Sequence, residues 1–459
     1  MKQTAVNRFG SWETAKRNAW VNTAKIALVL LRALSAALVW NECYWKRNVV
    51  MSMTRCELAL AVYLFVLILM CHVYDAFEVG SMDAGEVAYS LGLAQFFTLF
   101  FQYLILSFSL ERLLDPRGFL LLLLLDTGMN ILWAELMVRL HRALFPARRT
   151  YVICEDAGEI RENEGLRQLN WKFEVADFLD IGEGPEAVLP KLKDAEAVIL
   201  VNIHSGDRNQ ILKYCIAHEI QVYIRPRIGD LLMRGGSQLQ LLNVPVVHCG
   251  RYRKGMTYLI IKRLSDVVLS GLALVVLSPV MAVVAAMIRR YDGGPAFYRQ
   301  IRLTQDGREF EILKFRSMRV DAEQDGVARL AVEHDDRITP LGHFIRAVRI
   351  DELPQLINIL KGDMSIVGPR PERPELAEQY EETMPEFRLR LQAKAGLTGY
   401  AQVYGKYNTK PYEKLQMDLL YIAKQSVLLD LKLMFMTVKI LFKKDSTEGV
   451  EQGQTTAMK

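Results

Sequence analysis

The 459-residue sequence has only six cysteines, and their spacing excludes the usual cysteine-based sites. They stand at positions 43, 56, 71, 154, 215 and 249, with no C-x-x-C pair and no neighbouring cluster of histidines. A zinc site needs closely spaced ligands, and a disulfide framework belongs to short secreted chains. We therefore expect reduced thiols in a protein that faces the cytosol.

A strong excess of one charge is also missing. The formal net charge is only +5 at pH 7, so the sequence gives no argument for a nucleic-acid partner. Residues 1–23 are polar and contain no apolar core followed by small residues, so we do not expect a signal peptide.

Long hydrophobic runs, in contrast, are frequent in the first third of the chain. Hydrophobic residues make up 51% of the sequence, whereas 24% is charged, a mixture that indicates a membrane part and a water-exposed part. The four runs are Ala24–Trp40, Leu58–Val73, Tyr89–Leu110 and Phe119–Leu140. Because a membrane-spanning helix needs ~20 apolar residues, we predict a bundle of four transmembrane helices over residues 1–145. A buried helical domain of a soluble protein is the alternative.

Basic residues predict the orientation of this bundle. Five Lys or Arg residues precede the first run or start it, and Arg139, Arg142, Arg148 and Arg149 end or follow the fourth. Positive charge favours the cytoplasmic side, so both ends are expected in the cytoplasm. The basic joint at residues 46–55 argues against this topology, which places it outside.

Residues 146–255 have the pattern of an α/β domain. Strands are expected at Tyr151–Cys154, Ala197–Ile203, Gln221–Ile224 and Val244–Val247, which suggests a small Rossmann-like domain. The first strand is followed by the single glycine Gly158, not by the several glycines that let backbone N–H groups approach a pyrophosphate. A structural or regulatory module is therefore favoured over a nucleotide site.

The apolar segment Val267–Ile288 contains no charge but has Ser278 and Pro279 at its centre. A central proline bends a helix, and Lys262-Arg263 before it and Arg289-Arg290 after it place both flanks in the cytoplasm. We therefore favour a re-entrant helix that breaks at Ser278-Pro279 over a fifth crossing. It opens a domain at residues 256–445, and the polar tail at residues 446–459 is expected to be disordered.

Two groups of basic residues in this domain suit phosphate. Residues 295–318 predict a hairpin that turns at Gln305–Gly307, and its polar face is basic, with Arg299, Arg302, Lys314, Arg316 and Arg319. Further on, glycine and proline in Gly368-Pro-Arg-Pro371 predict a rigid turn that presents Arg370. The glycine-rich stretch Ala395–Asn408 allows backbone N–H groups to approach a ligand. A solvated surface and an ordinary loop are the alternatives.

The adjacent carboxylates Asp351 and Glu352 precede Leu353-Pro354 and so stand at a predicted helix start. The helix N-terminus favours negative charge, which keeps Asp351 available as a nucleophile or metal ligand. Successive helical side chains point about 100° apart, so the two carboxylates have separate roles. A capping aspartate is the simpler alternative for the pair alone.

Five motifs occur in the order in which they stand in one enzyme family: K-F-R-S-M at 314–318, D-E-L-P-Q at 351–355, K-G-D-M-S at 361–365, V-G-P-R-P at 367–371 and L-T-G-Y-A-Q-V at 397–403. Over residues 262–442 the chain resembles the polyprenyl-phosphate hexose-1-phosphate transferases, bacterial sugar transferases that initiate capsule and exopolysaccharide synthesis. The bundle and the α/β domain in front resemble the long-form members. Two departures are Ala395 and Tyr400, where many members have proline and tryptophan. A third is Lys406, which stands where arginine is common and cannot form its bidentate contact.

The resemblance implies covalent catalysis. Asp351 would attack the phosphate next to the sugar of a UDP-sugar, release UMP and pass the sugar phosphate to undecaprenyl phosphate. Glu352 would complete the dyad, and both carboxylates would bind Mg²⁺. We expect six residues of the motifs and their neighbourhood to bind substrate: Lys314, Arg316, Arg346, Asp363, Arg370 and Gln402. UDP-glucose and UDP-galactose are the expected donors, at the cytoplasmic face of the bacterial inner membrane.

Three further interpretations complete the sequence-based picture. The apolar and basic stretch Tyr412–Lys443 predicts an interfacial helix in contact with lipid, with a packed core helix as the alternative. The family suggests a homodimer. Rival functions are a glycosyltransferase that moves only the sugar and a non-catalytic membrane scaffold.

Overall fold

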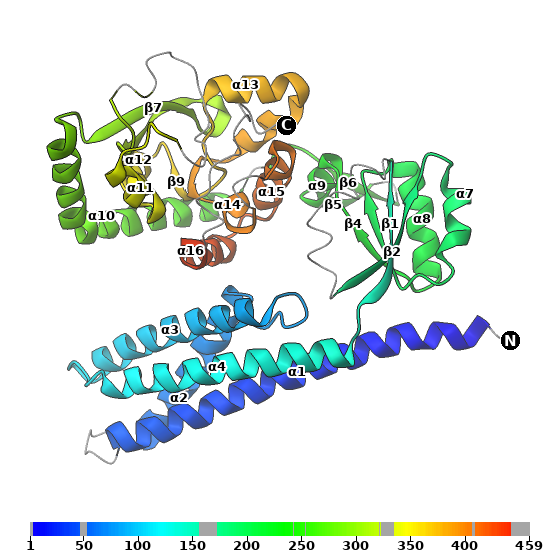
Figure 1. Ribbon diagram of the computed structural model, residues 1–459, viewed down its shortest axis with the longest axis horizontal. Helices are drawn as coiled ribbons and strands as arrows, with labels where there is room; N and C mark the ends of the chain where they lie inside the picture. The colour runs from blue at the N-terminus through cyan, green and yellow to red at the C-terminus, as the bar shows by residue number, and fades with distance from the viewer. Residues whose placement is uncertain are drawn as a thin grey trace. The chain divides into compact units, whose positions relative to one another are not determined.

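The computed structural model describes residues 3–45, 53–155, 172–241, 243–252, 254–320, 322, 335–405 and 409–441. These residues form two compact units, Met1–Arg225 and Pro226–Lys459 (Figure 1). The expected tail at 446–459, Lys406, Gly158 and most of the basic joint at 46–55 lie outside the described residues.

The four apolar runs at the start of the chain each lie in a long helix of the first unit. Helix α1 (Gln3–Trp40) continues into a π-helical turn, η1 (Asn41–Trp45). Three more helices follow: α2 (Met53–Val73), α3 (Ala84–Ser109) and α4 (Arg117–Leu144). With α10 (Met256–Asp292), the described chain has five helices long and apolar enough to cross a membrane, as in a multi-pass membrane protein.

A buried polar network joins all four helices of this bundle. The Arg32 guanidinium in α1 is ion-paired with Asp126 in α4, and both side chains are at most 2% exposed. Gln95 in α3 donates to the second Asp126 oxygen at 2.6 Å and to the Tyr63 hydroxyl in α2 at 3.0 Å. The arginine that interrupts the first apolar run therefore has an opposite charge inside the bundle, which is how charged groups are accommodated in membrane helices.

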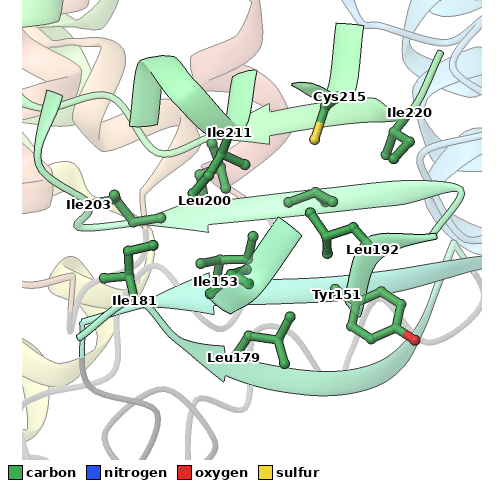
Figure 2. Close-up of a cluster of buried hydrophobic side chains, with 12 residues drawn as sticks. Tyr151, Ile153, Leu179, Ile181, Leu192, Leu200, Ile203, Ile211, Cys215 and Ile220 are labelled. Carbon is green, nitrogen blue, oxygen red and sulfur yellow. The ribbon is translucent and has the colours of Figure 1, made fainter. Parts of the chain in front are cut away.

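The rest of the first unit is a parallel α/β sheet. Its strands are β1 (Arg148–Cys154), β2 (Phe173–Asp180), β3 (Ala197–Val201) and β4 (Gln221–Ile224), in the order β2-β1-β3-β4. The connecting helices are α7 (Pro185–Val188), η2 (Leu189–Leu192) and α8 (Ser205–Ala217). Apolar side chains of the central strands and α8 meet in one core, with Ile153, Leu200 and Ile211 fully buried (Figure 2).

Two strand assignments differ from the sequence-based expectation. No strand was expected at β2, because its acidic residues hide the alternation of an edge strand. The strand expected at Val244–Val247 forms as β6 (Val244–His248), but it pairs antiparallel with β5 (Ser237–Leu241) in the second unit and does not extend the parallel sheet.

The second unit begins with α9 (Ile228–Arg234) and that β5–β6 hairpin, followed by α10. Next come the hairpin β7 (Phe297–Leu303), η3 (Gln305–Gly307) and β8 (Glu309–Phe315), then α11 (Pro340–Ala347), η4 (Ile350–Glu352) and α12 (Gln355–Lys361). Strand β9 (Ser365–Val367) precedes α13 (Pro374–Thr383) and η5 (Pro385–Gln392), and pairs in parallel with β10 (Gly396–Thr398). The unit ends with α14 (Tyr400–Tyr404), α15 (Pro411–Lys424) and α16 (Val427–Leu441). The hairpin expected around Gln305–Gly307 is confirmed.

Helix α10 is helical throughout, including Ser278 and Pro279, so the expected break is not an interruption of the helix. It changes direction sharply along its length (Figure 1). Both arms pack against the same unit. Arg263 in the first arm donates to the carbonyls of Ile359 and Leu360 at 2.7 Å, whereas Ile288 in the second arm joins a core cluster with Phe315 and Ile345.

We predict that Asp126→Ala opens the helical bundle, because removal of one partner of a buried ion pair costs about 3 kcal/mol or more. The measurement is maleimide labelling of Cys71, which is 1% exposed, during a detergent titration of a variant whose other cysteines are serine. Labelling should begin at a lower detergent concentration than in the parent.

The matched control is Asp83→Ala, which removes an exposed ion pair with Arg142 and should shift the titration far less. A double change, Arg32→Met with Asp126→Leu, should restore much of the protection. Equal shifts for Asp126→Ala and Asp83→Ala would contradict the assigned role of the buried pair.

Candidate active site

The two adjacent carboxylates lie in η4, a single 3₁₀ turn between α11 and α12. Arg349, just before this turn, has a left-handed backbone with φ 55°, a conformation that costs energy for a residue with a β-carbon. Pro354 is the N-cap of α12, so the proline stands just before the helix and not inside its first turn. The dyad is thus at a helical start, but this start is a separate 3₁₀ turn, and α12 begins only after it, at Gln355.

Glu352 is held by three cationic side chains from three different segments. Arg370 donates to Glu352 Oε1 at 2.9 Å, Lys314 Nζ lies 3.7 Å from the same oxygen, and Arg349 lies 3.7 Å from Oε2. Burial alone would raise the pKa of Glu352, whose side chain is 11% exposed, but Arg370, Lys314 and Arg349 together hold that pKa well below its usual range. Glu352 is therefore a fixed anion.

Asp351 is in a different state from its neighbour. Within the described residues, no side chain is hydrogen bonded or ion-paired to its carboxylate, which is partly buried. Burial raises the pKa of Asp351 and the Glu352 charge raises it further, while Lys314, Arg346 and Arg370 oppose the shift. The helix-start argument predicted the opposite direction, because it omitted burial and the adjacent anion. The carboxylate of Asp351 is unengaged and faces a cationic surrounding.

The β7–β8 hairpin supplies Lys314, but it does not have the single basic face expected from the sequence. Tyr298 pairs with Lys314 and Arg302 with Phe310, which puts Lys314 and Arg302 on one face. Arg299 lies on the other face, 3.4 Å from Glu311. Burial lowers the pKa of Lys314 to about 8, although the Glu352 charge acts in the opposite direction. Because side chains alternate along a strand, Lys314 and Arg302 share the face that belongs to the site, whereas Arg299 does not.

Arg370 is presented by the turn after β9, as the glycine and prolines suggested. A β-carbon on Gly368 would lie 2.1 Å from the Lys394 carbonyl oxygen, so only glycine fits where β9 meets β10. Two arginines hold the turn by its carbonyls: Arg390 donates to the Arg370 oxygen at 2.9 Å, and Arg302 donates to the Pro371 oxygen at 3.1 Å. The backbone that carries Arg370 is therefore fixed on both sides.

The other expected substrate contacts fall into two groups. Arg346 in α11 is near enough to act electrostatically on Asp351. Arg316 is instead ion-paired with Asp292 at the end of α10, Asp363 accepts from Arg308 at 3.2 Å, and Gln402 donates to the Leu397 carbonyl at 3.0 Å. The structure thus brings Lys314, Arg346 and Arg370 to the dyad and gives the remaining three other partners.

Arg349 is a neighbour of the site that the sequence-based predictions did not include, whereas Arg302 was predicted only as part of the basic face of the hairpin. Arg349 stands three residues before Glu352, a spacing at which opposite charges meet on a helical turn. That spacing was a usable signal. The left-handed backbone of Arg349 could not be predicted, because arginine is not a residue type that favours this conformation.

Within the described part of the chain, no group of three or more His, Cys, Asp or Glu side chains could by itself hold a metal ion. Mg²⁺ is commonly held by one or two carboxylates together with substrate phosphates and water. The unengaged carboxylate of Asp351 beside Glu352 fits this kind of site, whereas a cage made only of protein ligands does not.

We predict that Glu352→Gln lowers the pKa of Lys314 below its value of about 8, because the Glu352 charge is what opposes the effect of burial. A lower pKa means more neutral amine at pH 7 and faster acetylation of Lys314. The measurement is competitive labelling with acetic anhydride across pH, followed by mass spectrometry. Glu311→Gln, on the other face of the hairpin, should leave the titration of Lys314 in place. A raised or unchanged pKa in Glu352→Gln would refute the assignment.

Comparison with known proteins identifies the enzyme family. Residues 257–444 match the family model described as "Bacterial sugar transferase". Several relatives carry the name UDP-glucose:undecaprenyl-phosphate glucose-1-phosphate transferase, among them proteins of Escherichia coli, Xanthomonas campestris and Caulobacter vibrioides. The chain is 40% identical to that of Escherichia coli strain K12 over 208 residues, or 44% of this chain and 45% of the relative. It is 34% identical to that of Xanthomonas campestris pv. campestris over 272 residues, or 57% and 56%.

The third relative, from Caulobacter vibrioides, is 40% identical over 190 residues, which is 40% of this chain but 71% of the relative. The chain therefore spans about half the length of the first two relatives and more than two thirds of the third. All three matches and the family model have the same enzyme family in common, and the chain belongs to the bacterial sugar transferases.

Proposed function

We propose that this protein transfers a hexose-1-phosphate from a UDP-sugar to undecaprenyl phosphate and so initiates the synthesis of a capsule or exopolysaccharide. The observation that carries this proposal is the division within the dyad: Glu352 is fixed by three cations, whereas Asp351 has an unengaged carboxylate. The names of the relatives supply the substrate class and make UDP-glucose the first donor to test. UDP-galactose is the second, because a further relative, from Streptococcus agalactiae, is named a galactosyl transferase.

In the first step an Asp351 oxygen attacks the phosphorus next to the sugar. The bond from that phosphorus to the bridging oxygen breaks, and UMP leaves with the bridging oxygen and its electron pair. In the second step an oxygen of undecaprenyl phosphate attacks the same phosphorus, and the bond to Asp351 breaks. The carboxylate is regenerated, and the product is a sugar diphospho-undecaprenol.

The cations around the dyad explain how an anion can attack an anionic diphosphate. Lys314, Arg346 and Arg370 all lower the cost of negative charge at Asp351. The same side chains would neutralise the phosphoryl oxygens as charge develops on them. Glu352 positions Arg370 and Lys314 for this purpose, so its role differs from that of the nucleophile. Arg316, Asp363 and Gln402 are at most indirect contributors in this proposal, because each has another partner.

Asp351 and Glu352 are the residues that would hold Mg²⁺, with substrate oxygens and water as its other ligands. When bound, the ion supplies charge neutralisation to the diphosphate and its leaving group.

We further propose that α10 enters the cytoplasmic leaflet and returns, and that the catalytic unit faces the cytoplasm of the inner membrane. Asp266 in the first arm accepts from the Ile366 amide at 3.0 Å, and Ile288 in the second arm packs against Phe315. The packing of both arms on one unit supports a helix that enters and leaves the membrane on the same side. Between them Val275 and Val276 are 73% and 64% exposed, which suits a lipid-embedded bend.

The same proposal covers the other parts of the chain. Residues 1–145 would anchor the protein by four spans, residues 146–255 would form a Rossmann-like module, and residues 256–445 would carry catalysis. Helix α16 exposes Leu428 and buries Leu433, so it would serve both as a core helix and as an interfacial one. Homodimerisation remains part of the proposal on family grounds alone.

We predict that Asp351→Asn abolishes transfer, with a loss of at least about a thousandfold in rate, because an amide cannot form the phosphoryl ester. Purified protein with Mg²⁺ and undecaprenyl phosphate would be tested against a panel of UDP-sugars for UMP. The control is Asp336→Asn, a change of the same chemistry at an exposed position.

The products separate the rival functions. Release of UDP alone would show transfer of the sugar without its phosphate. Retained transfer in Asp351→Asn would remove this residue as the nucleophile, and absence of any transfer by the parent protein would favour the scaffold.

We predict that single cysteines placed at Leu259 and Tyr291, which are 48% and 56% exposed, are both labelled from the cytoplasmic side. The measurement compares a membrane-impermeant maleimide applied to intact spheroplasts and to inverted vesicles, in a variant without native cysteines. A cysteine at Val276 should react slowly from either side. Labelling of the two arms from opposite sides would show that α10 crosses the membrane.

A further inference from the structure

A second buried polar cluster lies in the catalytic unit, apart from the dyad. It consists of Tyr258 and Lys262 in α10, Tyr421 in α15 and Asp430 in α16, and is called the Asp430 cluster below. The Asp430 carboxylate accepts from Tyr258 at 2.9 Å, from Lys262 at 2.9 Å and from Tyr421 at 2.8 Å. Three donors from two other helices therefore converge on one buried carboxylate.

Two members of the cluster also reach the strand that leads to Arg370. Lys262 Nζ donates to the Val367 carbonyl oxygen at 3.0 Å. The Tyr421 hydroxyl lies 3.1 Å from the same oxygen and 2.8 Å from Asp430, so its single proton is shared between these two acceptors. Val367 is the last residue of β9 and is 1% exposed. Tyr258 donates to Asp430, and among the described residues it makes no hydrogen bond to Val367. Lys262 and Tyr421 therefore form the side of the cluster that contacts β9, and Tyr258 forms the side that does not.

The backbone between Val367 and Arg370 has little freedom to absorb a displacement. Gly368 is in contact with the Lys394 carbonyl, and its amide donates to the Thr398 oxygen at 2.8 Å. Pro369 fixes its own φ. A shift of the Val367 carbonyl is therefore transmitted to Arg370, whose guanidinium must remain 2.9 Å from Glu352.

We infer that the Asp430 cluster is a positioning site for Arg370, with Tyr421 and Lys262 as the positioning residues, an inference that rests on the transferase function proposed above. Asp430 orients the two donors, and the donors fix the Val367 carbonyl. The cluster connects the first arm of α10 and the helix α16 with the arginine that contacts the dyad.

The two tyrosines provide a matched test. Tyr258→Phe removes a hydroxyl that contacts Asp430, whereas Tyr421→Phe removes a hydroxyl that contacts Asp430 and Val367 and accepts from Lys262 at 3.2 Å. In the full-length protein, Tyr421→Phe should lower kcat/KM for the UDP-sugar about tenfold, since loss of bonds to a buried carbonyl misplaces Arg370. Tyr258→Phe should change kcat/KM by less than about twofold.

A double-mutant cycle with Arg370→Ala shows whether the effect passes through Arg370. If it does, Tyr421→Phe costs little more in the Arg370→Ala background, because the group that it positions is already gone. A general loss of stability would instead multiply the two effects. Unchanged thermal unfolding of Tyr421→Phe would support the positioning role.

The outcomes distinguish this inference from the proposed function. If the parent protein releases no UMP from any UDP-sugar, the proposed function fails. If the parent protein is active but the two tyrosine variants behave alike, or the effects of Tyr421→Phe and Arg370→Ala multiply, the function stands and the positioning role of the Asp430 cluster is wrong.

Discussion

The contact of Glu352 with Arg370, Lys314 and Arg349 is the interaction on which the rest of the site depends. It joins the 3₁₀ turn of the dyad, the β7–β8 hairpin and the turn after β9, three segments that share no regular secondary structure with one another. Displacement of any one of these segments would separate buried opposite charges, and an unpaired charge in such a place is costly. The position of each segment is therefore tied to that of the others.

The same arrangement leaves positive charge in excess beside Asp351. Glu352 is one anion among several cations, so the field at the neighbouring carboxylate is set by Lys314, Arg346 and Arg370 as well as by burial. A site of this kind suits a ligand that brings its own negative charge, as a nucleotide diphosphate and a lipid phosphate both do. The opposed pKa shifts of the two adjacent residues follow from contact with the cations. Glu352 is hydrogen bonded to Arg370 and lies 3.7 Å from Lys314 and Arg349, whereas Asp351 has no such direct partner among the described residues and has the Glu352 charge beside it.

Much of this fold could be predicted from the sequence, and the features that could not share a physical reason. Apolar runs and the glycine turn at 305–307 are local signals, and the four helices and the β7–β8 hairpin followed from them. The turn that presents Arg370 was equally local. The partners of Arg316 and Asp363 could not be predicted from local sequence. Arg316 pairs with Asp292 and Asp363 with Arg308, and because these partners are distant in sequence, only packing decides the pairing. The basic face failed for a simpler cause: Arg299 and Arg302 differ by an odd number of residues, so one strand sends them to opposite sides.

The ion pair within the helical bundle has a consequence for biogenesis. Arg32 and its acceptor on Asp126 are separated by 94 residues, so the first helix leaves the ribosome long before the fourth. During that interval the arginine has no acidic partner from α4, and a lone charge in the hydrocarbon is unfavourable. The first helix must therefore wait, in the translocation machinery or near the membrane surface, until α4 arrives. Insertion of this bundle is therefore cooperative, because α4 supplies the carboxylate that pairs with the arginine of α1.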